Sequence, residues 1–137
     1  MQPTFRAARA PDVDDILTLW RDADAAPTHT DDAESVLRLI GTDADAVIVA
    51  EEGGAIVGTV IAGWDGWRGS IYRLAVVPTH RRRGVGRQLL ERAGERLTRA
   101  GARRLQAIVV ESDEQAVAFW RTSGWEEQVE RLRFVMG

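Results

Sequence analysis

Two amphipathic helices are predicted near the start of the chain, after a short strand at Thr4–Arg9. Pro11 suits the first turn of the first helix, where its missing N–H group is not needed. The apolar stripe of this helix follows the i, i+3, i+4, i+7 spacing at Val13, Ile16, Leu17 and Trp20. Asp31 and Glu34 have the spacing of a capping box and predict a second helix that ends near Gly41. The stripe of the second helix consists of Ala33, Val36, Leu37 and Ile40.

The middle of the chain changes from helical to strand periodicity. Ala46–Ala50 and Ile56–Ala62 are short β-branched runs, and Gly53-Gly54 between them predicts a hairpin turn. Asp65-Gly66 predicts another tight turn, and the largely apolar segment Ser70–Val77 predicts the strand that follows it.

The second half of the chain alternates helices and strands. The longest helix is predicted from Val85 to about Arg99, and another over Asp113–Ser123. Arg104–Val110 has almost no polar face, so we expect a strand that is buried on both sides. Two short strands near Trp125–Val129 and Leu132–Val135 are predicted to finish the chain.

The predicted order of elements is β-α-α-β-β-β-α-β-α-β-β. We expect one continuous domain over residues 1–137, because the chain has no repeat, linker or low-complexity tract. Hairpins combined with helix crossovers imply a mixed, mostly antiparallel sheet of about seven strands, with four helices on both faces. The predicted fold class is therefore α+β.

The composition excludes several kinds of site. The 137 residues contain no cysteine, which removes disulfides, thiolate metal sites and cysteine nucleophiles. Only His29 and His80 could supply imidazole ligands, so we expect no metal centre. No apolar run approaches the roughly 20 residues that cross a bilayer, and the amino terminus has no signal pattern. We therefore expect a cytoplasmic protein without a membrane partner.

Charge is divided unevenly along the chain, and all 18 basic residues are arginine. Residues 1–65 hold 4 Arg and 13 Asp or Glu, whereas residues 66–137 hold 14 Arg and 8 Asp or Glu. A basic half suits a polyanionic ligand and an acidic half a cationic one, although two solvated faces would give the same pattern. Nucleic acid is not the expected polyanion, because the net charge is −3 and aromatic residues do not interleave with the arginines.

A strand, a basic loop and a helix start follow one another between Leu74 and Arg87. Free N–H groups at a helix amino terminus, together with the helix dipole, favour an anion. Gly84 and Gly86 permit close backbone approach, and the loop arginines add charge and hydrogen-bond donors. These residues indicate a phosphate or pyrophosphate ligand.

Two common phosphate motifs do not fit. A P-loop ends in Gly-Lys-Ser/Thr, and the chain has no lysine. The dinucleotide fingerprint requires a third glycine where this chain has Leu89, and it follows the first strand of a βαβ unit. An ordinary basic helix start remains the alternative to a phosphate site.

Three segments resemble one known family. Arg81-x-x-Gly84-x-Gly86, directly after Leu-Ala-Val-x-Pro, resembles the acetyl-CoA-binding motif of the GNAT N-acetyltransferase superfamily. Glu111–Trp125 is similar to the family's Asn-x-x-Ala…Tyr-x-x-x-Gly-Phe segment, and Trp64–Gly69 resembles a turn of small bacterial members. Nearly the whole chain agrees with the element order of that family, so the resemblance implies the GNAT fold.

The resemblance implies that acetyl-CoA binds where the fourth strand separates from the fifth. Pantetheine would pair with backbone groups of Leu74 and Val76, and the pyrophosphate would meet the amides of residues 82–87. An amine acceptor would enter from the opposite side, over the first two helices, and no metal would be required. The expected cofactor-binding residues are Leu74, Ala75, Val76, Arg81, Arg82, Arg83, Gly84, Val85, Gly86, Arg87, Asp113 and Trp120.

Two of these residues depart from the family pattern. Asp113 replaces the usual Asn, which keeps a hydrogen-bond acceptor and loses the amide donor. Trp120 stands where the family usually has Tyr, the candidate acid for the leaving CoA thiolate. An indole N–H is no acid near neutral pH, so Trp120 would orient or shield the thioester, or simply fill the core beside Phe119.

Tyr72 is the candidate catalytic residue. The family often places a base two or four residues before Leu-Ala-Val, and those positions hold Tyr72 and Ser70. Strand alternation would put Tyr72 on the same side as Leu74 and Val76, facing the cleft. It could act alone or through water, with Asp65 or Glu111 as a relay; a packing role for Tyr72 is the alternative.

The expected reaction is direct transfer of the acetyl group from acetyl-CoA to a primary amine in a ternary complex. The alternative is a CoA-binding module, or a degenerate GNAT protein, without transferase activity. The sequence leaves the acceptor open among small molecules and peptides. It also leaves the oligomeric state open, and sheet edges near the carboxyl terminus could pair in a homodimer.

Overall fold

The computed structural model describes residues 2–23 and 28–137. They belong to two compact units, Met1–Ala107 and Ile108–Gly137. The elements of the first unit are β1 (Thr4–Ala7), a 3-10 turn (Ala10–Asp12), α1 (Val13–Asp22), α2 (Ala33–Thr42), β2 (Val47–Glu52), β3 (Ala55–Trp64), β4 (Gly69–Val76), a second 3-10 turn (Pro78–His80), α3 (Val85–Ala100) and β5 (Leu105–Ala107). The second unit contains α4 (Glu114–Arg121).

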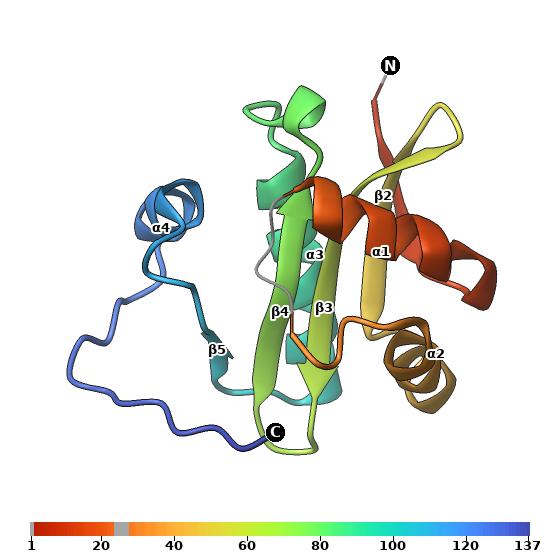
Figure 1. The fold of residues 1–137 in the computed structure, drawn as a ribbon. Coiled ribbons are helices and arrows are strands. Elements are labelled where there is room, and N and C mark those ends of the chain that lie inside the picture. Colours follow the sequence, from red (N-terminus) through yellow and green to blue (C-terminus); the bar gives the residue numbers. More distant parts are fainter. Residues whose placement is uncertain (1, 24–27) are drawn as a thin grey trace. The chain divides into compact units, whose positions relative to one another are not determined.

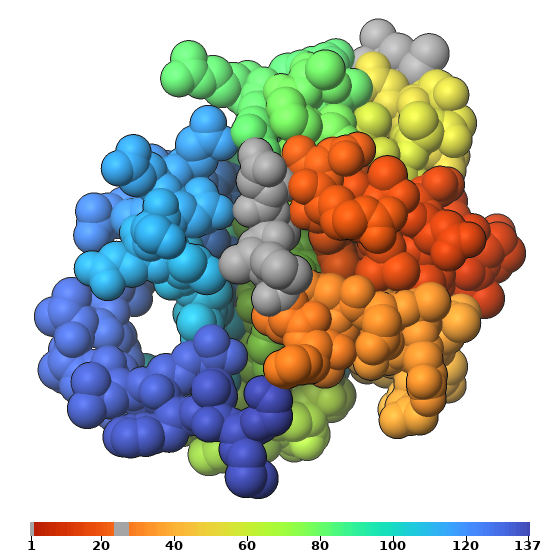
Figure 2. Space-filling model, viewed as in Figure 1, coloured from red at the N-terminus to blue at the C-terminus, as the bar shows by residue number. Residues whose placement is uncertain are grey.

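The five strands form one mixed sheet in the order β1-β2-β3-β4-β5. Neighbours from β1 to β4 are antiparallel, and β5 is parallel to β4. Helices α1 and α2 lie on one face of the sheet and α3 lies on the other (Figure 1). The space-filling view shows the atoms of α1 and α2, red to orange, over the sheet on the first face (Figure 2). The predicted α+β class with a mixed sheet is confirmed.

Each face of the sheet carries an apolar layer. The layer under α1 and α2 includes Ile16, Trp20, Val36, Val49 and Ile61. On the other face, α3 buries a stripe made of Val85, Leu89, Leu90, Ala93 and Leu97. Gly58 on β3 allows α3 to come close, because a Cβ at this position would lie 2.9 Å from Leu89 Cδ1. The stripe read for the first helix therefore faces the sheet as expected. In α2, however, Leu37 is 42% exposed and Leu39 packs against the core instead, so part of that predicted stripe is wrong.

Turn and cap residues explain where the first elements begin and end. Gly53 and Gly54 have φ of 61° and 82°, which matches the tight hairpin predicted between β2 and β3. The N-cap of α2 is Asp32, whose side chain accepts from the Ser35 amide at 2.7 Å. The capping role expected of Asp31 is therefore wrong, and its carboxylate binds elsewhere.

β5 is shorter than the strand predicted at Arg104–Val110. Only Leu105–Ala107 pairs with β4, and β5 is the last strand of the sheet. Ile108 and Val110 are 57% and 51% exposed. The expectation of a strand buried on both sides is wrong, because an apolar run alone does not separate a central strand from an edge strand.

The two strands predicted near Trp125–Val129 and Leu132–Val135 are not formed in the second unit. In the ranges that the structure describes, the sheet has five strands rather than about seven, and the order ends with β5 and α4. The segment alternates arginine with apolar residues, but a strand also requires a neighbouring backbone to pair with. Leu132 and Phe134 are 83% and 89% exposed, so no layer of the second unit covers them.

Candidate active site

β4 has an open backbone edge in the described part of the first unit. Its pairing with β5 covers only Gly69–Ile71, although β4 continues to Val76. On the other side, the Val77 amide donates to the Val57 carbonyl of β3 at 2.9 Å. Successive residues of a strand direct their backbone groups to opposite edges, so Leu74 and Val76 direct theirs to the open edge. These are the two residues expected to pair with pantetheine.

A β-bulge interrupts β4 beside this edge. Two residues of β4, Arg73 and Leu74, lie opposite one residue of β3. Arg73 has a φ of 49°, a left-handed conformation that costs a non-glycine residue roughly 1–2 kcal/mol. The extra residue reverses the alternation of side chains along the strand.

The bulge decides which way Tyr72 points. Tyr72 pairs with Ile61, and both Ile61 and Ala75 belong to the core under α1 and α2. Tyr72 and Ala75 therefore share that face, whereas Leu74 and Val76 direct their side chains to the α3 face. The alternation argument that grouped Tyr72 with Leu74 and Val76 is wrong. The Tyr72 side chain is 51% exposed on the face that carries α1 and α2.

The loop after β4 combines left-handed backbone with a helix start. Among the described non-glycine residues, a positive φ occurs only at Arg73 and at Arg82, where it is 64°. Gly84, the N-cap of α3, has a φ of 80°. The first hydrogen bond of α3 runs from the Gln88 amide to the Gly84 carbonyl at 3.0 Å. The amides of residues 85–87 precede that bond, so they lie where the helix dipole favours an anion.

Ion pairs and hydrogen bonds tether the loop to neighbouring elements. Glu52, at the end of β2, has one carboxylate oxygen 2.7 Å from His80 Nε2 and the other 3.6 Å from an Arg83 guanidinium nitrogen. The guanidinium of Arg81 donates to the carbonyl of Ala23, directly after α1, at 3.4 Å. Two of the arginines expected at the phosphates therefore also hold the loop against β2 and α1.

Asp65, one candidate relay, shapes the turn between β3 and β4. Its carboxylate accepts from the amides of Arg68 at 2.7 Å and Trp67 at 2.8 Å. These hydrogen bonds, that from Arg68 first, hold the pKa of Asp65 below its ordinary value. A carboxylate with a lowered pKa is a poor proton acceptor, so this geometry weakens the case for Asp65 as a relay.

The second unit holds the remaining candidate residues. Asp113 is the N-cap of α4, and its carboxylate accepts from the Ala116 amide at 3.1 Å. Trp120 makes edge-to-face contacts with Phe119 and Trp125, at centroid distances of 5.7 and 4.9 Å. Trp120 is half-buried and α4 has no buried residue, so these ring contacts pack Trp120 against its neighbours without placing it in a core. The other candidate relay, Glu111, also belongs to this unit.

Several residues that organise the site escaped the sequence reasoning. Arg73 binds Asp31 across 42 positions, and Thr59 binds the Arg73 carbonyl across 14. Glu52, at the end of β2, meets His80 of the loop after β4. No local pattern signals such partners, although Arg73 directly precedes the Leu-Ala-Val segment.

Along the chain, β4, its loop and α3 are followed by α4, which is the order of the two sequence motifs. Comparison with known protein families then identifies the family. The model of the Acetyltransferase (GNAT) family matches residues 13–125. The chain belongs to this family. The matched range contains β4, the loop after it, α3 and α4.

Solved structures share the GNAT fold with this chain. PaiA N-acetyltransferase from Thermoplasma acidophilum, in complex with coenzyme A, aligns with a TM-score of 0.80 at 13% identity over 93% of this chain and 92% of that chain. A transcriptional regulator from Bacillus halodurans C-125 gives 0.78 at 21% over 98% and 99%. An aminoglycoside 6'-N-acetyltransferase from Acinetobacter haemolyticus gives 0.73 at 16% over 98% of each. These likenesses establish the fold.

The described residues contain neither a membrane-spanning helix nor a cluster of metal ligands. No helix within 2–23 and 28–137 is long and apolar enough to cross a membrane. Within the same ranges, no group of three or more potential His, Asp or Glu ligands is arranged to hold a metal ion.

Proposed function

We propose that this GNAT protein transfers the acetyl group of acetyl-CoA to a primary amine of a small molecule or peptide. The observation that carries the proposal is the continuity of the open β4 edge with the left-handed loop and the α3 amino terminus. Acetyl-CoA supplies an activated thioester, and its pantetheine and pyrophosphate require hydrogen-bond partners of these two kinds.

The backbone carries most of the proposed cofactor site. Leu74 and Val76 would offer N–H and C=O groups to pantetheine, and the Val76 N–H would stabilise the oxyanion that forms at the thioester carbonyl. The amides of residues 85–87 receive the pyrophosphate, with the exposed Arg82 and Arg87 adding charge. Gly84 keeps its left-handed φ without strain and allows phosphate to approach the loop.

The acceptor is proposed to approach over α1 and α2. The acidic first half of the chain favours a cationic amine there. The amine must be neutral to attack, so its proton passes to water, either directly or through the Tyr72 hydroxyl, which accepts it while donating its own proton. Relatives with this fold include an aminoglycoside acetyltransferase, which supports an amine acceptor without specifying one for this chain.

A CoA-binding protein without transferase activity is the second candidate. It is favoured by Trp120, which replaces the family's usual acid and packs between Phe119 and Trp125. The replacement does not by itself prevent turnover, because positioning and oxyanion stabilisation supply much of the acceleration and solvent can protonate a thiolate.

The test combines binding with turnover. Acetyl-CoA should raise the thermal midpoint by mass action, and Gly86→Glu should remove this shift by placing bulk and negative charge at the pyrophosphate. Gly41→Glu is the matched control, since a side chain at Gly41 on α2 meets open space.

Turnover is read as CoA released with spermidine, lysine methyl ester, a short peptide, kanamycin and an aryl amine. Release with at least one amine supports the transferase. A shift without any release supports the binding module, and a full shift in Gly86→Glu contradicts the cofactor site.

A further inference from the structure

We propose that Arg73 and Asp31 form a positioning pair that holds the acceptor side of the site against the open edge of β4. This inference rests on the proposed acetyl transfer, and it assigns to the pair a role in amine binding rather than in cofactor binding. Both residues belong to the first unit.

The pair is bidentate and largely withdrawn from solvent. Arg73 Nε donates to Asp31 Oδ1 at 3.0 Å, and a second guanidinium nitrogen donates to Oδ2. Each side chain is 16% exposed. The carboxylate of Asp31 also accepts from the Thr28 amide at 2.9 Å, which closes a short turn ahead of α2. The fork of Arg73 therefore fixes a backbone turn, in addition to a single side chain.

The backbone of Arg73 is fixed from the opposite direction. Its carbonyl accepts from the Thr59 hydroxyl at 3.1 Å, and that hydroxyl accepts from the Trp20 indole N–H at 2.9 Å. Thr59 is completely buried and is the one buried polar residue in the described ranges. Thr59 therefore connects α1 to the bulge by hydrogen bonds. In addition, the Arg73 guanidinium lies 5.5 Å from the centre of the Trp20 ring.

Neither the left-handed backbone of Arg73 nor its buried ion pair with Asp31 maximises the stability of the fold. A left-handed arginine is strained, and a desolvated ion pair is often no more stable than apolar residues of similar volume. Both occur at one residue, directly between the exposed Tyr72 and the open-edge residue Leu74. Such strain, held in place by surrounding bonds, is typical of functional positions.

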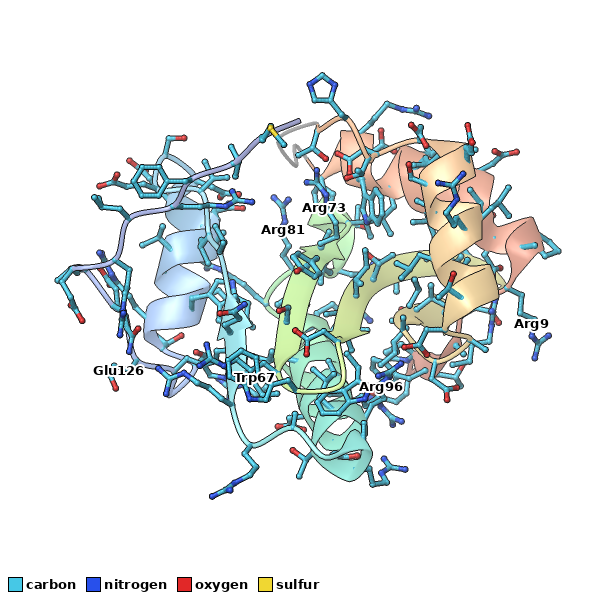
Figure 3. All side chains as sticks on the ribbon, turned by 90° about the horizontal axis from the view of Figure 1, so that it is seen from below. Arg9, Trp67, Arg73, Arg81, Arg96 and Glu126 are labelled. Atoms are coloured by element: carbon cyan, nitrogen blue, oxygen red, sulfur yellow. The ribbon has the colours of Figure 1, made fainter. Side chains whose placement is uncertain are left out.

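The Arg73 side chain points to the face proposed for the acceptor and away from the amides proposed for the cofactor. Figure 3 shows Arg73 and Arg81 pointing toward the side of the sheet that carries α1 and α2. Tyr72 shares that face, whereas the amides proposed for pyrophosphate lie at the start of α3 on the other face. A change in the pair should therefore move the turn at residues 28–31 relative to Tyr72 and leave the cofactor loop in place.

The first experiment compares Arg73→Gln with Arg96→Gln. Arg96 is the matched control because its side chain is 15% exposed, close to the 16% of Arg73, and it pairs with Asp43, which is 31% exposed, on the opposite face of the sheet. With the best amine of the panel, Arg73→Gln should lower kcat/KM about ten- to hundred-fold, mainly by raising KM for the amine, as misplacement by about 1 Å does. Acetyl-CoA affinity should change less than about two-fold in both variants, since neither side chain is proposed to touch the phosphates.

Two further substitutions at Arg73 separate the effect of its side chain from the effect of its left-handed backbone. Arg73→Gly relieves the left-handed strain and should stay folded, yet it should lose amine affinity as Arg73→Gln does. Arg73→Lys keeps the charge without the planar fork and should recover part of the loss.

The outcomes distinguish this inference from the proposed function. If the wild-type protein releases no CoA with any amine, the proposed function fails and the positioning role falls with it. If the wild-type protein is active but Arg73→Gly keeps its amine KM, or Arg96→Gln raises it equally, the positioning role alone is overturned.

Discussion

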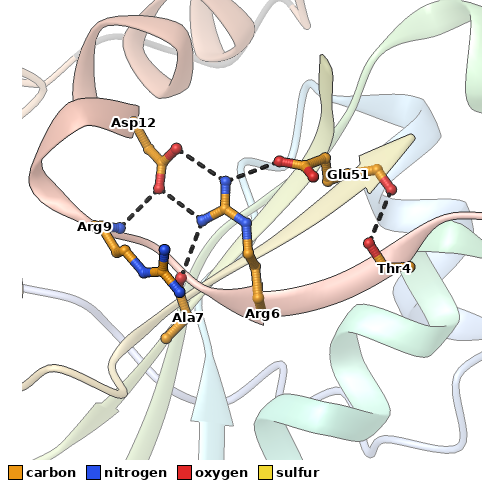
Figure 4. A network of polar contacts seen from close by, with 6 residues as sticks. All are labelled: Thr4, Arg6, Ala7, Arg9, Asp12 and Glu51. Atoms are coloured by element: carbon orange, nitrogen blue, oxygen red, sulfur yellow. Dashed lines mark hydrogen bonds and ion pairs between the residues drawn. The ribbon is translucent and has the colours of Figure 1, made fainter. Parts of the chain in front are cut away.

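Arg6 and Arg73 are two arginines of one sheet that use the same chemistry for different ends. Arg6 donates to both oxygens of Asp12, at 2.8 and 3.0 Å, and to Glu51 at 2.9 Å (Figure 4). Arg73 likewise binds an aspartate with two nitrogens. Arg6, however, lies on the edge strand β1, in regular pairing with β2. Arg73 sits on a bulge of β4 in left-handed backbone.

The difference shows that the role of an ion pair depends on the backbone conformation of the residues that form it. The pairing of β1 with β2 around Arg6 is regular, although β2 shifts its register with β3 beside Glu51, and the network joins β1, the following turn and β2 at the rim of the sheet. Removing the Arg6 network should lower the free energy of unfolding and leave activity unchanged. Around Arg73 the pairing is broken beside an open edge, so its removal should cost function first.

The largest expected effect concerns Tyr72, the residue next to the bulge. If its hydroxyl takes the amine proton or relays it, Tyr72→Phe should lower kcat/KM about ten- to ten-thousand-fold, the range usual for general acid–base groups. The affinity for acetyl-CoA should stay constant, which calorimetry measures. Trp120→Phe is the comparison variant and should be mild if Trp120 only packs. Full activity of Tyr72→Phe would show that the Tyr72 hydroxyl is neither the base nor its relay.

Thr59→Val should have the next largest effect because it removes the hydroxyl shared by α1 and the bulge. The Trp20 N–H and the Arg73 carbonyl lose a buried partner, so the free energy of unfolding should fall by about 2–4 kcal/mol. The KM for the amine should rise as well. Thr4→Val is the control, since the Thr4 hydroxyl makes a long, exposed bond of 3.4 Å to Glu51. Urea unfolding and amine kinetics check both variants.

Arg6→Gln should destabilise the fold without touching catalysis. Charge-assisted bonds to two carboxylates are lost at a site where Arg6 is 29% exposed, so we expect a loss of about 1–2 kcal/mol. The kcat/KM of the folded protein should be unchanged. A selective rise in amine KM would end the contrast drawn between the two arginines.

The smallest expected effect is a pH dependence at the Arg6 network. The hydrogen bond from Arg6 holds the pKa of Asp12 below its ordinary value of 3.8. The ionised Asp12 therefore contributes stability that is complete above that value and is lost as pH falls through the lower, folded pKa. Asp12→Asn should be less stable than wild type near neutral pH, and the two thermal midpoints should converge in acid. Midpoints that stay equally far apart in acid would contradict this linkage.

Local patterns predicted most elements of the first unit. The stripe of α1, the Gly53-Gly54 turn and the start of α3 at Val85 all follow from spacing within a few residues. The motif proposed to bind the cofactor is also local, because a strand, a loop and a helix start follow one another in the sequence. Its placement of Leu74 and Val76 on the open edge agrees with the backbone geometry.

Features that depend on distant partners could not be predicted in the same way. The bulge at Arg73 shows only in the register with β3, and it reverses the face expected for Tyr72. Asp31 and Asp32 are adjacent and chemically identical, so spacing alone did not tell the cap from the partner of Arg73. The strand pattern after Arg131 lacked the neighbouring backbone that strands require.

The bulge also divides β4 into two stretches that can vary independently in evolution. Under the proposed function, positions before it that face α1 and α2, such as Tyr72, can be exchanged to suit a new acceptor while Leu74 and Val76 keep the backbone roles proposed for them. Loss of a single residue at the bulge would instead turn the earlier positions over, moving the buried Ile71 into the place of the exposed Tyr72. Acceptor range should therefore diversify by substitution at this strand, and a one-residue deletion there should be selected against.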